Sequence, residues 1–141
     1  MTADQIADEI VAVFNALTGQ QFVFTAEKPN DIIAVETERF DFGVYVIPKD
    51  EQEEAIGDQS DTCKRTRIVS IAVNGPIKVC EGWTLGKFAQ QFEALRMALE
   101  GTEFSGYRWD RNEVVSLWDN DALRTRNRFL ALFEATYCTF S

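Results

Sequence analysis

The segment from Arg126 to Phe140 constrains the fold of this chain most, because its side chains alternate with a period of two. One alternating set contains aromatic and small residues, namely Phe129, Ala131, Phe133, Ala135 and Tyr137. The other set contains Leu130, Leu132, Glu134, Thr136 and Cys138. The period indicates a strand, although a strand of this length is unusual and the span Leu123 to Ala135 also suits a helix. The β-branched and aromatic ending at residues 136–140 favours the strand.

Two other segments show the spacing of an amphipathic helix. The first runs from Thr2 to Leu17, with apolar residues at Ile6, Ile10, Val13, Phe14 and Leu17. Acidic residues near its beginning favour the helix dipole, and Thr18-Gly19 supplies a stop. The second follows Thr84, a suitable N-cap, and carries Phe88, Phe92, Leu95 and Leu99 on one face. Gly101 is suited to a left-handed cap at its end.

Shorter patterns predict the remaining strands. They lie at Gln21 to Ala26, Asp41 to Ile47, Arg67 to Asn74 and Asn112 to Trp118. Pro48 is expected to end the second of these, and Asn74-Gly75-Pro76 is expected to form a turn. The order predicts an α+β fold, an antiparallel or mixed sheet of about four to five strands with two main helices packed on one face. A chain of 141 residues fits a single domain spanning residues 1–141.

The segment from Lys49 to Asp61 is the most unusual part of the sequence. It has six acidic residues against one lysine: Asp50, Glu51, Glu53, Glu54, Asp58 and Asp61. No apolar pattern runs through it, so we expect a mobile loop over about residues 49–62.

A basic patch follows directly, with Lys64, Arg65 and Arg67. The simplest interpretation of acids beside bases is a solvated hairpin whose two sides attract each other. In a ring of subunits, the same charges would instead join the acids of one copy to the bases of its neighbour.

The sequence offers no candidate for catalysis, and we assign no catalytic, cofactor-binding or metal-binding residue. It contains no His, which removes the commonest general base and most zinc sites. It also lacks a phosphate-binding glycine motif, and Asp50, Asp58 and Asp61 lack the spacing of a calcium loop. Tyr107 and Trp109 lie in an expected loop flanked by bases, a composition typical of protein interfaces. For Trp109, packing at the edge of the core is slightly favoured over an interface.

Charge and cysteine content narrow the partners. The formal net charge of −9 disfavours general nucleic-acid binding and is most simply explained by solubility. A basic partner and an acidic channel lining are the sharper alternatives.

Three cysteines without a C-x-x-C pair indicate reduced, buried or half-buried thiols. We find no transmembrane or secretory pattern and expect the protein to stay where it is made.

The order of elements resembles a family of tailed-phage neck proteins, the tail terminator or tail completion proteins of the phage lambda terminator type. The resemblance rests on these segments: the helix Ile6 to Leu17, the strand Phe42 to Ile47 with Pro48 before a charged insertion, the strand Arg67 to Val73, the helix Phe88 to Leu99, and the strands Val114 to Trp118 and Phe129 to Phe140. It spans nearly the whole chain but contains no diagnostic motif.

The resemblance implies a virion structural protein, made in the host cytoplasm, that forms a homo-oligomeric ring, usually a hexamer. Such a ring caps the tail tube, docks to the head connector, and lets DNA pass through an acidic lumen without specific binding. Residues Asp50 to Asp61 and Lys64 to Arg67 would then meet the tube, the connector or neighbouring subunits. The alternative is a small acidic inhibitor or anti-defence protein that imitates DNA, although its acids crowd into one segment.

Overall fold

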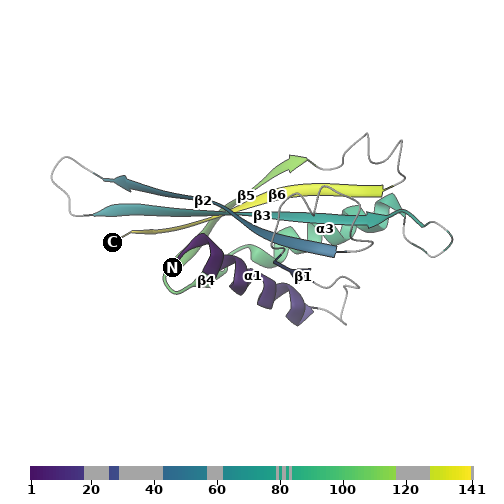
Figure 1. Cartoon of the computed structure of the whole chain (residues 1–141), viewed down its shortest axis with the longest axis horizontal. Helices are drawn as coiled ribbons and strands as arrows, with labels where there is room; N and C mark the ends of the chain where they lie inside the picture. Colours follow the sequence, from purple (N-terminus) through teal and green to yellow (C-terminus); the bar gives the residue numbers. More distant parts are fainter. Residues whose placement is uncertain are drawn as a thin grey trace.

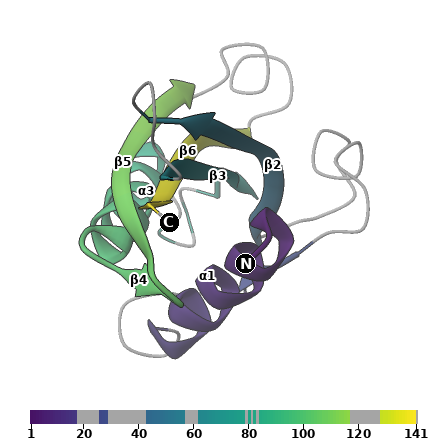
Figure 2. The same cartoon turned by 90° about the vertical axis from the view of Figure 1, so that its left-hand side faces the viewer.

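A curled, mixed sheet of six strands forms the body of the protein, and two helices lie on one side of it (Figures 1 and 2). The computed structural model describes residues 1–17, 26–28, 43–56, 62–78, 80, 82, 84–116 and 128–140. The strand order is β1-β2-β3-β6-β5-β4. The predicted α+β class is confirmed, with a slightly higher strand count than expected.

Both predicted helices are present. Helix α1 spans Ala3–Leu17 and begins with a capping box, in which Thr2 Oγ1 accepts from the Gln5 amide and Gln5 Oε1 accepts from the Thr2 amide. Helix α3 spans Leu85–Leu99, and the Thr84 hydroxyl accepts from the Lys87 amide as its N-cap. Gly101 follows α3 with a φ of +76°, the left-handed conformation expected of it.

Four long strands carry the sheet, and a short strand lies at each edge. The strands are β1 Ala26–Glu27, β2 Gly43–Ala55, β3 Cys63–Pro76, β4 Glu103–Phe104, β5 Tyr107–Ser116 and β6 Arg128–Phe140. All neighbours are antiparallel except β1 and β2, which are parallel. Residues 128–140 are therefore a strand as predicted, and the helical alternative is wrong for residues 128–135.

The core lies between the helices and one face of the sheet. The alternation of β6 places Phe129, Ala131, Phe133, Ala135 and Tyr137 in this core. The rings of Phe88 and Phe129 stack with centroids 5.1 Å apart, and Phe92 meets the edge of Phe133 at 5.3 Å. Aromatic pairs in these geometries contribute about 0.5–1.5 kcal/mol beyond their buried area, so α3 is held tightly to β6.

Two of the predicted strand ends are wrong. Pro48 does not end β2, because the strand continues to Ala55 through a register shift between Pro48 and Asp50. A proline is tolerated next to such an irregularity in a strand near the sheet edge. Residues 74–76 are not a turn, since Asn74, Gly75 and Pro76 pair with Leu130, Phe129 and Arg128 of β6.

Two predicted loops are also strands. Residues 49–55 belong to β2, and residues 107–111 belong to β5. Several other expectations lie outside the described residues: the strand Gln21 to Ala26 except for Ala26, the beginning of the strand Asp41 to Ile47, and the end of the strand Asn112 to Trp118.

Candidate functional site: a charged arm

The paired strands β2 and β3 project beyond the helices as an arm (Figure 1). We use the name arm for residues 50–56 and 62–68. Residues 51–56 are exposed along their whole length. The arm therefore belongs to the sheet but has little core of its own.

Opposite charges face each other across the arm. In the β2–β3 register Glu51 lies beside Arg67, Glu53 beside Arg65, and Glu54 beside Lys64. Arg65 Nε is 3.8 Å from Glu53 Oε1, and Arg67 NH2 is 3.5 Å from the same oxygen. The interpretation as a hairpin whose two sides attract each other is confirmed. Cross-strand pairs contribute roughly 0.2–1 kcal/mol each, and exposed ion pairs lie at the low end.

Two large apolar side chains are exposed on the arm or beside it. Ile56 is 37% exposed, and its amide donates to the Thr62 carbonyl at the end of the described hairpin. Phe140, the last residue of β6, is 62% exposed and pairs in register with Lys64. Apolar surface flanked by charged residues is typical of a protein contact site.

The interface residues predicted from the sequence differ in how exposed they are. Asp50, Glu51, Glu53, Glu54 and Arg65 are exposed, and Lys64 is half-buried. Asp58 and Asp61 lie outside the described residues.

Arg67, Tyr107 and Trp109 are fully or partly buried within the protomer. Arg67 and Tyr107 are buried, at 6% and 4% exposure. Trp109 packs against the core, as its edge-of-core alternative predicted, and its indole N–H donates to Asn112 Oδ1 at 2.9 Å. Arg67 and Tyr107 are therefore poorly placed to meet a partner directly, whereas Trp109 stays partly exposed.

At the base of the arm, the Arg67 guanidinium connects several elements. Its Nε donates to the Met1 carbonyl at 3.0 Å, and its NH1 donates to the Thr66 carbonyl at 3.1 Å. The guanidinium carbon lies 5.4 Å from the centroid of the Tyr107 ring, within range of a cation–π interaction. Glu51 Oε1 accepts from the Ala3 amide at 2.7 Å.

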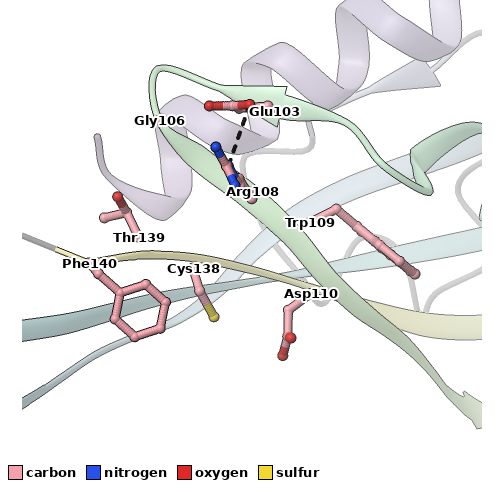
Figure 3. Close-up of a pocket in the computed structure, with 8 residues that line it drawn as sticks. All are labelled: Glu103, Gly106, Arg108, Trp109, Asp110, Cys138, Thr139 and Phe140. Atoms are coloured by element: carbon pink, nitrogen blue, oxygen red, sulfur yellow. Dashed lines mark ion pairs between the residues drawn. The ribbon is translucent and has the colours of Figure 1, made fainter. Parts of the chain in front are cut away.

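A shallow cavity that was not predicted from the sequence lies beside the arm (Figure 3). Its volume is about 440 Å³, and it is lined by Glu103, Gly106, Arg108, Trp109, Asp110, Cys138, Thr139 and Phe140. Arg108 points toward Glu103, with Nε and Oε2 3.7 Å apart (Figure 3). The β4–β5 turn makes one wall, with Ser105 and Gly106 at positive φ. Gly106 was the only local sign of this turn.

The cavity contains one thiol. Cys138 lines it, and the buried thiol lies 3.7 Å from the Thr66 hydroxyl. Within the described part of the chain, no three His, Cys, Asp or Glu residues converge to hold a metal ion. The three thiols are free, and Cys80 is exposed rather than buried as expected.

Tyr137 is fully buried in the core near the base of the arm. Its hydroxyl shares a 2.7 Å hydrogen bond with the Thr102 hydroxyl. Burial raises the pKa of Tyr137 to about 12 from 10.0, although the hydrogen bond acts in the opposite direction. Below pH 10 both the folded and the unfolded chain keep this proton. Between pH 10 and 12 only the unfolded chain loses it, so stability falls as pH rises.

Because Tyr137 loses its proton only in the unfolded chain, we expect the free energy of unfolding to fall by about 1.4 kcal/mol per pH unit between pH 10 and 12. Urea unfolding at a series of pH values from 9 to 12 measures the decline. In Tyr137→Phe the decline should be shallower, while Thr102 keeps its bond to the Leu99 carbonyl. Equal slopes in the two proteins would contradict the assignment.

Comparison with models of known protein families finds no match to this chain, and comparison with curated protein sequences also finds none. No helix in the described ranges is long and apolar enough to cross a membrane.

Proposed function

We propose that this chain is a structural subunit of a tailed-phage neck, which forms a ring that terminates the tail tube and docks to the head connector. The projecting arm is the observation that supports this proposal most. Residues 51–56 are exposed, and β3 is paired with β6 on its other side only as far as Lys64, so the end of the arm buries little surface of its own. Such an arm is best explained by contacts outside its own protomer.

A ring follows from the geometry of such a contact. An arm that reaches a different surface on the next copy makes a heterologous interface, and repetition of that interface closes a ring when the rotation fits. Exposed acids, the bases of β3, Ile56 and Phe140 supply both charge and apolar area for this contact. The partners in this proposal are further copies of the chain, the tail tube and the connector, and DNA passes through without specific binding.

The DNA-mimic alternative fits the arm less well. A mimic presents carboxylates that are free to meet a basic enzyme surface. Here Glu51 and Glu53 lie within 4 Å of arginine nitrogens from the neighbouring strand. Their negative charge is therefore partly neutralised within the protomer.

Native molar mass by light scattering, over a concentration series at low and high salt, tests the ring. We expect a mass near six copies of the 16.0 kDa chain. Added salt should shift the mass toward the monomer, because it screens exposed charge pairs. A mass of 16.0 kDa under all conditions would contradict a self-assembling ring and make the DNA mimic the better proposal.

A further inference from the structure

We infer that the beginning of α1 latches the base of the arm and thereby fixes the direction in which the arm projects. The latch consists of Met1, Ala3, Glu51, Arg67 and Tyr107. It joins three elements that are far apart in sequence: the start of α1, the β2–β3 arm, and the start of β5. The inference concerns the protomer and does not require that the ring forms.

Arg67 is the centre of the latch. Its guanidinium holds the Met1 carbonyl on the helix side and the Thr66 carbonyl on the arm side. The Tyr107 ring lies 5.4 Å from the guanidinium, and Glu53 lies at 3.5 Å on the arm. A buried guanidinium is costly unless such partners surround it. Loss of any one of them weakens the others, so the group favours a single geometry of arm and body.

Glu51 supplies the second connection. Its carboxylate accepts from the Ala3 amide, one of the first N–H groups of α1, which have no partner within the helix. The helix dipole also favours a negative charge at this end. A residue of the arm therefore caps the helix, and a hydrogen bond to a charged group is stronger than a neutral one.

The position of the latch explains why it controls direction. Core side chains end at this level of β3, where Val69 is buried in the core and Arg67 begins the charge-paired part. Beyond it, residues 52–56 of the arm are exposed. Because β3 stays paired with β6 as far as Lys64, loss of the contact lets this whole end of the sheet change its twist relative to α1 and thereby moves the arm.

The spread of distances between two spin labels tests the latch. The labels go on Thr62→Cys near the end of the arm and on Met97→Cys on the outer face of α3, both exposed positions. Cys63 and Cys80 are replaced by Ser in this background, and Cys138 is left because it is buried. Pulsed electron paramagnetic resonance on dilute monomer then gives the distance distribution.

We expect one narrow distribution for the parent and at least a doubling of its width in Glu51→Ala and in Arg67→Met. Glu51→Gln should broaden it less, because an amide oxygen still accepts from the Ala3 N–H. Glu54→Ala is the matched control: it lies on the same strand but pairs in register with Lys64 instead of Arg67, and it should leave the width unchanged.

Circular dichroism melting confirms that each variant is folded. Should Arg67→Met fail to fold, Glu51→Ala decides the matter alone. A folded Glu51→Ala protein with the parental width would overturn the latch. The native mass of the same proteins is measured separately, so a monomeric parent with a working latch contradicts only the ring.

Discussion

A chain without the outer part of the arm should fold normally and fail to assemble. Gln52 and Thr66 are register partners, so residues 53–65 can be replaced by Asn-Gly as a two-residue turn. No member of the main core cluster lies in the part of the removed segment that the structure describes, residues 53–56 and 62–65. We therefore expect a cooperative thermal transition close to that of the parent, with a native mass of one subunit.

The expected loss of assembly is at least 100-fold in the dissociation constant, measured by light scattering over a dilution series. The matched control is the exchange Glu54→Lys with Lys64→Glu, which keeps the arm and reverses the charges of one cross-strand register pair without changing the partners of Arg67. Its assembly shows whether the neighbour requires the shape of the arm or its charge pattern. An armless chain with the parental mass would remove the arm from the interface.

Phe92→Ala should lower the free energy of unfolding by about 3–5 kcal/mol, because the substitution leaves a cavity in the core. Phe92 is fully buried in α3 and meets the edge of Phe133 across the core. The free energy of unfolding of a typical domain is about 5–15 kcal/mol, so this loss is a large part of its stability. Urea unfolding gives the value directly.

Met97→Ala is the control for this substitution. It removes a large side chain from the same helix, but Met97 is 60% exposed and should change the free energy of unfolding by less than about 0.5 kcal/mol. A loss below about 1 kcal/mol for Phe92→Ala would show that α3 does not pack against β6 as described.

The elements that bury one face could be predicted from the sequence. In α1, α3 and β6 the spacing of apolar residues reports which side meets the core, and the Thr84 cap and Gly101 mark the ends of α3. The same reasoning gave the α+β class. It works because burial of one face imposes a period that a single sequence displays.

The candidate site could be predicted only in part. The acidic half of β2 buries no face, so it has no apolar period and resembles a loop. Its strand structure depends on bases that lie opposite in β3, and that register is visible only in three dimensions. The shallow cavity and the latch likewise join residues from distant segments, which no local pattern connects.

The carboxylates along the outer edge of β2 affect how copies of this chain pair with one another when many are present in one cell. Exposed strand edges pair readily with one another and lead to aggregation unless charge, proline or a bulge interferes. This edge has all three, namely Pro48, the adjacent register shift and a run of carboxylates. Two such edges would bring like charges together. Newly made copies are thereby kept from sticking through their arms in the wrong pairing.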